Sequence, residues 1–514
     1  MLFKRVIHFG SRLHSMIFYD WPIGQVFMQL KQIYWNPMNP AWYRRQKFTS
    51  FTIFFCSSVV LNHNTKEGLE KPPYWVYTGL KFRKEYSMES YSFDDLIITL
   101  DKKGSREFYK VSFPFRYGHF SEIKTPDFIF QFNLNGEIKF IQGIGQNWPH
   151  PAEWLKRTVG NDWIYYSSGD YKDINDYFGE YYFPYFSYPS NSIMDGNPFS
   201  DHAVNSAMKS WPLVHAKIKK LVPRAKSKRL KDLFMRVTEK DQESLRRRSD
   251  QLHHFIGGQV TVLPPDTRHV DYEVIPIIVA DGCLYHCGFC RVKTGQDFTP
   301  RTSKDIIGQI KNLKQFYGQD LRNYNAIFLG QHDALSAGRE LLELAARNAY
   351  EMFEFERSYL KGASLFLFGS VDSMVHVEEK VFESLNALPF STYINIGLES
   401  NDPATLEVLK KPVSVQKVRE AFDRILDINR RYEKIEVTAN FVFGRDLPSG
   451  HLPSLLELTR HKLNSSYDKG AVYLSPLMEE GLRDKESKRE LLRRFLKLKT
   501  QSRLPTFIYL IQRL

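Results

Sequence analysis

The second half of the chain repeats a short apolar segment followed by a stretch with helical periodicity. Six apolar segments recur, Glu273–Ala280, Asn325–Gly330, Ala363–Gly369, Thr392–Gly397, Ile435–Phe443 and Ala471–Leu474. Their spacing of roughly 25 to 50 residues is typical of βα units arranged around a parallel sheet. We therefore predict an α/β fold, a partial (β/α)6 barrel of the TIM-like kind, whose ligands lie at the C-terminal ends of the strands.

The intervening stretches carry the helical period that this fold requires. One has Ile306, Ile310 and Leu313 on one face, behind a capping pattern at Thr302 and Asp305. Another repeats the pattern with the apolar residues Val415, Val418, Phe422, Ile425 and Leu426. Both stretches are expected to be helices that pack one face on the sheet.

Three of the four cysteines in the chain fall within eight positions, directly after the first apolar segment. Cys283, Cys287 and Cys290 form a C-x3-C-x2-C cluster. Three thiolates can hold three irons of a 4Fe–4S cluster and leave the fourth iron without a protein ligand. A zinc site completed by His286 is an alternative, as is a purely electron-carrying cluster. Cys56 has no obvious partner, which argues against disulfides and for the reducing cytoplasm.

The length of 514 residues favours two or three domains. With 42% apolar and 25% charged residues, the composition is that of a soluble globular protein. The longest apolar run, residues 51 to 61, is shorter than the roughly 18 to 20 residues of a membrane span. Arg12 interrupts the N-terminal apolar stretch and no small-residue cleavage site follows, so we expect no signal peptide and no membrane partner.

The first 215 residues differ in character from the rest. Residues 109 to 115 alternate like a strand, and residues 128 to 141 read as a β-hairpin with a two-residue turn at Asn135-Gly136. Residues 163 to 188 hold twelve aromatic side chains, which form either a stacking platform for bases or sugars or, as we favour, a packing region. We predict a β-rich, aromatic-rich α+β accessory domain over residues 1–215.

A basic segment follows this domain. Residues 217 to 250 hold 13 Lys and Arg against 5 Asp and Glu, which is +8 of the net +13. Ile218, Leu230 and Phe234 give it an apolar side, and Pro223 is expected to divide it. We favour a solvated helical connector, with an RNA- or DNA-contacting element or a membrane-surface helix as alternatives. The predicted domains are then a basic connector over 216–265, the barrel over 266–480 and a C-terminal helical extension over 481–514.

The cysteine loop after a first strand, with Phe289 just before the last cysteine, resembles the signature of the radical S-adenosylmethionine (SAM) superfamily. The resemblance covers about residues 270–480. It implies that Cys283, Cys287 and Cys290 hold a 4Fe–4S cluster and that SAM is the second cofactor. In that superfamily, reductive cleavage of SAM yields a 5′-deoxyadenosyl radical that abstracts hydrogen from an unactivated carbon.

Three further segments resemble secondary motifs of the superfamily, although the Gly-Gly-Glu motif that binds the SAM amino group is absent. The segment 329–335 occupies the position of that motif. Gly397-Leu-Glu-Ser400 is similar to a SAM-contacting segment of the coproporphyrinogen-oxidase-like branch, and 440–444 to one that flanks the adenine. The resemblance thus implies the following cofactor-binding residues: Phe289, Gly330, Gln331, His332, Asp333, Glu399, Ser400, Asn440, Val442, Phe443, Gly444 and Arg445.

Some of these residues have a simpler interpretation. Asp333 is as well suited to capping the helix after the second strand, and Glu399 to a structural ion pair. His332 is either an acid–base group or a hydrogen-bonded structural histidine. Arg445 either holds the methionyl carboxylate or forms a surface salt bridge. These alternatives are left to the structure.

The second substrate is not encoded in any motif, and no catalytic side chain is predicted. We favour a small molecule, enclosed between the N-terminal domain and the barrel, over tRNA or another nucleic acid. A non-catalytic iron–sulfur or zinc protein is the third possibility. The resemblance also implies a low-potential electron donor such as ferredoxin or flavodoxin. No cobalamin-binding pattern and no second cysteine group is visible.

Overall fold

The computed structural model describes the chain in two compact units, residues 1–82 and 83–514. The described residues are 5–7, 16–18, 89–108, 116–151, 153–167, 183–185, 197–290, 295–461, 463, 469–477 and 485–514. In the first unit they comprise an antiparallel pair of short strands, β1 (Arg5–Ile7) and β2 (Met16–Phe18).

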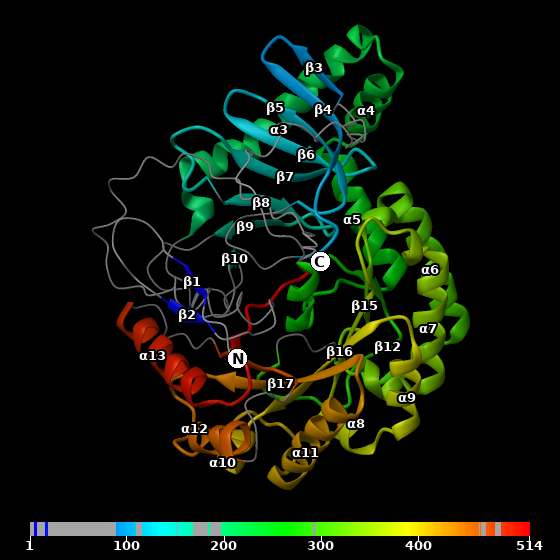
Figure 1. The fold of residues 1–514 in the computed structure, drawn as a ribbon. Helices are drawn as coiled ribbons and strands as arrows, with labels where there is room; N and C mark the ends of the chain where they lie inside the picture. Colours follow the sequence, from blue (N-terminus) through cyan, green and yellow to red (C-terminus); the bar gives the residue numbers. More distant parts are fainter. Residues whose placement is uncertain are drawn as a thin grey trace, which may run out of the picture. The chain divides into compact units, whose positions relative to one another are not determined.

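The second unit contains a seven-stranded parallel sheet, so the predicted α/β barrel is confirmed (Figure 1). In spatial order its strands are β11 (Ile275–Ile277), β14 (Ala326–Leu329), β15 (Ser364–Gly369), β16 (Ser391–Glu399), β17 (Ile435–Phe443), β18 (Val472–Pro476) and β19 (Thr506–Ile508). The first six coincide with the six predicted segments. The seventh, β19, is added in parallel to β18 from the C-terminal segment.

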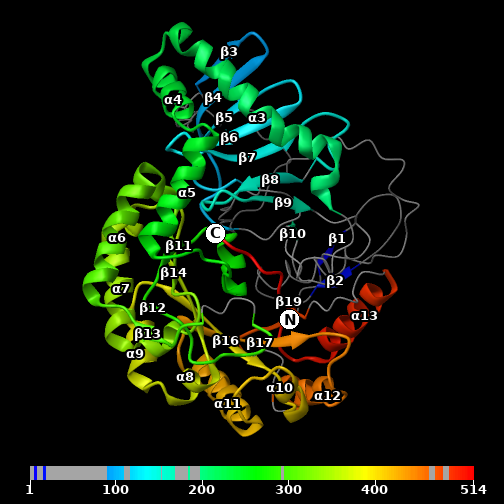
Figure 2. The same ribbon diagram turned by 180° about the vertical axis from the view of Figure 1, so that it is seen from behind.

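Strand β17 has one apolar face and one more polar face. Along β17, Val437, Ala439 and Phe441 belong to the main hydrophobic core, whereas the alternate residues Thr438 and Asn440 are buried polar groups. This follows from the period of two along a strand. Helices cover the outer face, as both views show (Figure 2). The inner face therefore keeps the polar groups that a ligand site needs.

The helices begin and end where local signals place them. In α6 the Thr302 hydroxyl accepts a hydrogen bond from the Asp305 amide at 3.2 Å, as predicted, and Ile306, Ile310 and Leu313 are buried. The helices of the barrel are α6 (Ser303–Tyr317), α7 (Arg339–Met352), α8 (Val371–His376), α9 (Glu379–Ala387), α10 (Pro403–Val408), α11 (Val415–Arg431), α12 (His451–Leu456) and α13 (Lys485–Gln501). Among the described residues, no helix has the length and apolarity to cross a membrane.

An eight-stranded antiparallel sheet precedes the barrel, and this confirms the predicted β-rich N-terminal region. In spatial order its strands are β10 (Phe183–Tyr185), β9 (Trp163–Ser167), β8 (Trp154–Arg157), β7 (Ile138–Gly143), β6 (Phe128–Phe132), β5 (His119–Lys124), β4 (Leu96–Lys103) and β3 (Ser90–Phe93). In the described part of the aromatic run, Tyr165 and Tyr166 are buried in packing contacts. The predicted strand at 109–115 lies outside the described residues.

The predicted hairpin is present between β6 and β7, but its two-residue turn was wrong. The Asn133 amide donates to the Glu137 carbonyl, so three residues lie between them. The Asn133 side-chain oxygen also accepts from the amides of Asn135 at 3.1 Å and Glu137 at 2.9 Å. These side-chain bonds stabilise the longer loop, in which Gly136 supplies the positive φ of +79°.

The basic segment is helical and packs on the antiparallel sheet. It spans the end of α3 (His202–Leu221), then α4 (Lys228–Thr238) and most of α5 (Gln242–Ile256), with Pro223 in the break after α3. Its apolar residues belong to the core that covers this sheet. Several of its cations form ion pairs with the β3–β4 region, Lys217 with Asp95, Arg224 with Asp94, and Arg229 with Glu89 and Asp101. A sizeable part of its charge is thus used within the protein.

Buried ion pairs join the antiparallel sheet to the barrel. Glu273, just before β11, contacts Lys139 at 2.7 Å and Lys156 at 2.6 Å. The two lysines lower the pKa of Glu273 to about 2 against the opposing effect of burial. Asp320 accepts hydrogen bonds from the Asn133 side chain at 3.0 Å and the Leu134 amide at 3.2 Å. The hairpin turn is thereby fixed to the N-terminal side of the barrel.

Candidate cofactor site

The three cysteines lie on the loop that follows β11 and the two-residue strand β12 (Ala280–Asp281). Gly282 begins the loop with a φ of +74°, a conformation that favours glycine. Cys287 is buried, and Cys283 and Cys290 are half-buried. The Tyr285 amide donates to the Cys283 sulfur at 3.4 Å. The loop thus starts at the C-terminal end of the first strand, where the sequence places it.

Electrostatic interactions show that the thiols lie near one another and near two further strand ends. Burial raises the pKa of the Cys283 thiol, with smaller contributions from Asp333 and Cys290. Burial also raises the pKa of Cys287, which interacts with Lys411 and Glu399 and with the other two thiols. Asp333 follows β14, and Glu399 ends β16. The structure therefore gathers the cysteines and two of the predicted cofactor residues at one end of the sheet.

Three thiols are a donor set of the kind that holds a 4Fe–4S cluster with one open iron. Within the described part of the chain, no three His, Cys, Asp or Glu side chains lie close enough together to hold a metal ion. In a cluster each thiolate binds a different iron, so the sulfurs need not converge. The His286 side chain is about half exposed, and its Nε2 atom lies 3.2 Å from an Asp297 carboxylate oxygen. This contact does not favour His286 as a fourth zinc ligand.

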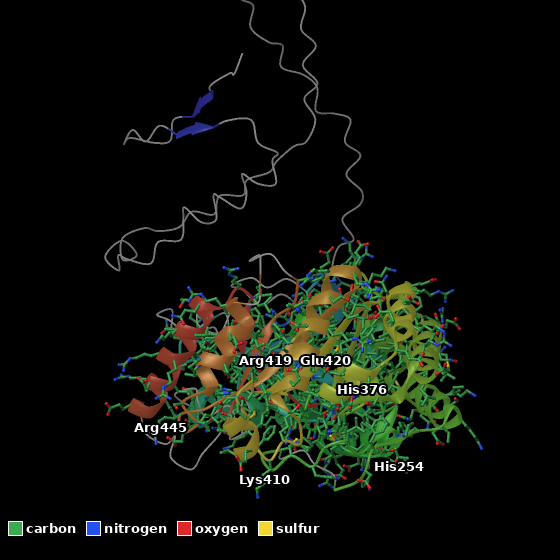
Figure 3. The ribbon with its side chains drawn as sticks, turned by 90° about the horizontal axis from the view of Figure 1, so that it is seen from below. His254, His376, Lys410, Arg419, Glu420 and Arg445 are labelled. Atoms are coloured by element: carbon green, nitrogen blue, oxygen red, sulfur yellow. The ribbon has the colours of Figure 1, made fainter. Side chains whose placement is uncertain are left out.

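The cysteine loop is fastened to α10 and α8. The Gly288 amide donates to the Leu409 carbonyl at 3.0 Å, and a Cβ at position 288 would lie 3.0 Å from the Lys410 side chain. The Tyr285 hydroxyl donates to Asp372 at 2.5 Å. Figure 3 shows Lys410 at the edge of the molecule, away from the α11 residues that the figure labels. The loop is thus held by Leu409 after α10 and by Asp372 of α8.

At the end of β14, the polar residues divide into one that is fully engaged and one that is not. Asp333 is 3% exposed, and its two oxygens accept from the Ser370 amide at 3.1 Å and the Ser336 hydroxyl at 2.9 Å. It makes no side-chain cap to the turn that follows. The Nε2 atom of His332 is buried without a hydrogen-bond partner among the described residues. A bound ligand would supply that partner.

The end of β16 is irregular. The pairing with β17 shifts register between Gly397 and Glu399, and Glu399 has a φ of +66°. Its carboxylate folds back, because a Cβ at Gly397 would lie 2.7 Å from the Glu399 Oε1 atom. Lys411 Nζ lies 3.8 Å from that oxygen. Burial raises the pKa of Glu399, and Lys411 opposes the shift.

Ser400 is fully buried, and its hydroxyl is engaged with other parts of the protein. It accepts from the Asp402 amide at 3.0 Å and lies 2.8 Å from His451 Nδ1. The other ring nitrogen, Nε2, lies 2.9 Å from the Val442 carbonyl. Ser400 and His451 therefore join the end of β16 to the end of β17.

The β17 residues face both sides of the sheet. Asn440 lies beside Gly397 in the sheet, and its Oδ1 atom is buried without a partner among the described residues. Phe443 packs in the outer core, 6.3 Å from the ring of Phe495, whereas Val442 lies outside that core. Arg445 is exposed and pairs with Asp446 at 3.2 Å (Figure 3).

Sequence reasoning missed two residues of this region. Lys411 is 7% exposed and faces both Glu399 and the Tyr285 ring, whose centre is 5.1 Å from Nζ. It lies three residues after the end of α10, outside the segments that the sequence analysis singled out. His451 lies in no motif, and its contacts arise only from the folded arrangement of β16, β17 and α12.

Comparison with known proteins identifies this part of the chain. Residues 277–458 match the family described as the Radical SAM superfamily. A search of curated protein sequences gives no significant match. Residues 277–458 thus match a radical SAM domain, which agrees with the resemblance of the cysteine loop.

Several solved structures are similar to the chain at low identity. A radical SAM methyltransferase from Sphaerobacter thermophilus is 13% identical with a TM-score of 0.31, and 46% of this chain covers 65% of that one. Coproporphyrinogen III oxidase from Escherichia coli is 12% identical with a TM-score of 0.29, with coverages of 44% and 52%. Methylornithine synthase is 12% identical with a TM-score of 0.27, with coverages of 62% and 85%. The chain thus spans less than two thirds of the first two relatives, and similarity at this level carries no conclusion about substrate.

Proposed function

We propose that the protein binds a 4Fe–4S cluster through Cys283, Cys287 and Cys290, and that it uses SAM to abstract hydrogen from a small-molecule substrate. When bound, these cofactors supply a carbon-centred radical by reductive cleavage of the sulfonium. The observation that carries the proposal is that Lys411 lies 3.8 Å from Glu399 at the end of β16 and 5.1 Å from the ring of Tyr285 in the cysteine loop, which brings the loop to that strand end. Ligands of barrel enzymes bind at such strand ends.

The residues of the site divide into those that face the cofactor and those that hold others in place. His332 Nε2 and Asn440 Oδ1 have unused hydrogen-bonding capacity, which suits polar groups of SAM. The Glu399 carboxylate suits the ribose hydroxyls. Asp333 and Ser400 have their oxygens occupied inside the protein, so we assign them positioning roles.

The remaining cofactor contacts are assigned by position. Gly330 and Gln331 lie beside His332 at the end of β14, and Phe289 lies beside Cys290. The backbone of residues 442–444 would border the adenine, and Arg445 would reach the methionyl carboxylate by leaving its pair with Asp446. A low-potential carrier such as ferredoxin or flavodoxin would supply the electron, and the cytoplasm would keep the thiols reduced.

A small substrate is favoured over RNA by the ion pairs of the basic segment. Acidic side chains of the β3–β4 region pair with Lys217, Arg224 and Arg229. These pairs reduce the positive charge that is available to bind phosphates. The small-molecule and nucleic-acid hypotheses predict different salt dependence of substrate binding. Binding of tRNA that falls steeply between about 50 and 200 mM salt would favour nucleic-acid modification. Transfer of deuterium from a labelled extract component to 5′-deoxyadenosine would name a small substrate directly.

The reaction class is tested on the reconstituted full chain. Protein loaded with iron and sulfide without oxygen, then reduced, is expected to release 5′-deoxyadenosine from SAM, as measured by mass spectrometry. Cys287→Ala should abolish both this release and the visible absorption of the cluster, because one iron loses its ligand. The control is Cys56→Ala, which removes the cysteine outside the cluster and should change neither. Wild-type protein that binds no iron, or cleaves no SAM, would refute the proposal.

A further inference from the structure

Glu399 has a backbone conformation that needs an explanation. A φ of +66° is unusual for a residue with a long side chain and costs free energy unless the surroundings impose it. The conformation turns the carboxylate back over Gly397, whose lack of a Cβ leaves the room. It also directs the carboxylate to Lys411 and the cysteine loop. The residue that follows, Ser400, is where the chain is held in this turn.

Two hydrogen bonds hold the Ser400 hydroxyl and a third holds His451, and their directions can be assigned. The Val442 carbonyl can only accept, so His451 carries its proton on Nε2 and donates to it at 2.9 Å. His451 Nδ1 is then an acceptor and receives the Ser400 hydroxyl proton at 2.8 Å. The Asp402 amide donates to the Ser400 oxygen at 3.0 Å. The chain of bonds is complete only with a neutral imidazole.

The arrangement is fully enclosed. Ser400 and His451 are each 0% exposed, so neither is in place to contact a ligand directly. Burial lowers the pKa of His451, and the Val442 carbonyl and Asp402 oppose the shift. His451 joins the ends of β16 and β17. Both strand ends carry residues that are assigned to the cofactor, so His451 would affect the cofactor through those residues.

We infer that His451 is a positioning residue for the SAM site, because it holds Ser400 and so fixes the turn that presents the Glu399 carboxylate. The inference rests on the proposed function, since it assigns that carboxylate to SAM. His451 also donates to the Val442 carbonyl, so it contacts the ends of both β16 and β17. The residue lies outside every segment that resembles a known motif.

Two amide variants of His451 distinguish a positioning role of the residue from a packing role. An asparagine at 451 places its amide oxygen near the position of Nδ1 and can still accept from Ser400. A glutamine places its amide near Nε2 and can still donate to Val442, but it leaves Ser400 without its acceptor. Both His451→Asn and His451→Gln remove one of the two bonds and replace the imidazole ring by a smaller amide side chain. A purely structural role would therefore be affected similarly by both.

The measurement is the dissociation constant for SAM by titration calorimetry, on anaerobically reconstituted full-length protein with matched iron content. We expect His451→Gln to weaken SAM binding about 10- to 100-fold, as for the loss of a hydrogen bond that orients a charged group. His451→Asn should stay within about threefold of wild type. Ser400→Ala should weaken binding as His451→Gln does, and the double variant should be no weaker than either.

The matched control is His215→Gln in α3, which packs on the antiparallel sheet. It removes a half-buried imidazole whose Nε2 atom lies 3.1 Å from the Thr238 carbonyl, and it should leave SAM affinity unchanged. A further readout needs no cofactor, since ¹⁵N chemical shifts of the cluster-free protein should show His451 as the neutral Nε2–H form. Equal affinities for the Gln and Asn variants, or an Nδ1–H form, would overturn the inference. Failure of wild-type protein to bind iron or SAM would instead overturn the proposed function.

Discussion

Lys411 and Glu399 are the charged pair on which the interior of the site depends. Both side chains are almost entirely enclosed, at 4% and 11% exposure, and their charged atoms are 3.8 Å apart. Burial raises the pKa of Glu399, and Lys411 opposes that shift because a cation beside a carboxylate favours its charged form. The pair also brings the segment after α10 towards the cysteine loop.

Replacing Lys411 by methionine is expected to destabilise the protein by about 3 kcal/mol, because it leaves Glu399 buried without its counter-ion. Chemical denaturation at pH 7 measures the change. The matched control is Lys410→Met, since Lys410 is exposed and its loss should change stability by less than about 0.5 kcal/mol. Equal losses for the two variants would show that the ion pair has no special weight.

The sequence predicted the residues that lie in local motifs and missed those whose role depends on contacts between distant segments. The cysteines and the segment from Gly397 to Ser400 were found because their spacing is itself the signal. His451 was not, because 51 residues separate it from Ser400 and no spacing links them. The occupied oxygens of Asp333 were equally invisible, since they depend on Ser370 from the next strand.

Among elements, α6 shows how a local signal fixes a boundary. The Thr302 hydroxyl accepts from the Asp305 amide and also donates to the Asp305 carboxylate at 2.6 Å. These contacts satisfy an amide at the helix start that has no partner within the helix. Because α6 packs against β11, its first turn supports the strand that leads into the cysteine loop.

Thr302→Ala is expected to lower the free energy of unfolding by about 1 kcal/mol, since the cap is lost. Thr302→Ser keeps the hydroxyl and should remain within about 0.5 kcal/mol of wild type. Urea denaturation followed by circular dichroism distinguishes the two. A serine variant as unstable as the alanine variant would indicate that the methyl group, not the cap, matters.

The strands were predictable to the extent that they bury long apolar segments. Six of the seven parallel strands follow from such segments, but β19 has only three residues and follows Pro505, so no periodicity marks it. The hairpin between β6 and β7 was predictable from its flanking strands. Its turn was not, because the Asn133 side chain replaces the bonds expected of a tighter turn.

At the junction between the antiparallel sheet and the barrel, Asp320 makes the stability of the whole molecule depend on pH. Burial raises the pKa of Asp320 from 3.8 to about 7, against Lys139 and the hydrogen bonds of the hairpin turn. The folded protein therefore holds a proton that the unfolded chain releases above pH 3.8. Stability from this group is present below pH 3.8 and is lost as the pH rises to about 7.

Asp320→Asn mimics the protonated form and should remove this pH dependence. We expect the variant to be more stable than wild type at pH 8, by at most roughly 4 kcal/mol, and similar to wild type near pH 4. Thermal unfolding across that pH range measures the difference. Parallel pH profiles for the two proteins would show that Asp320 is not the titrating group.

The bond between Gly288 and Leu409 has a consequence for how the protein is made. The two residues are 121 positions apart in the chain (409 − 288). At a synthesis rate of about 5 to 20 residues per second, Leu409 emerges roughly 6 to 25 seconds after the cysteines. During that interval the three thiols belong to a nascent chain without their outer support. The Gly288–Leu409 bond can form only after Leu409 has been made, so the cysteine loop reaches its folded contacts late in synthesis.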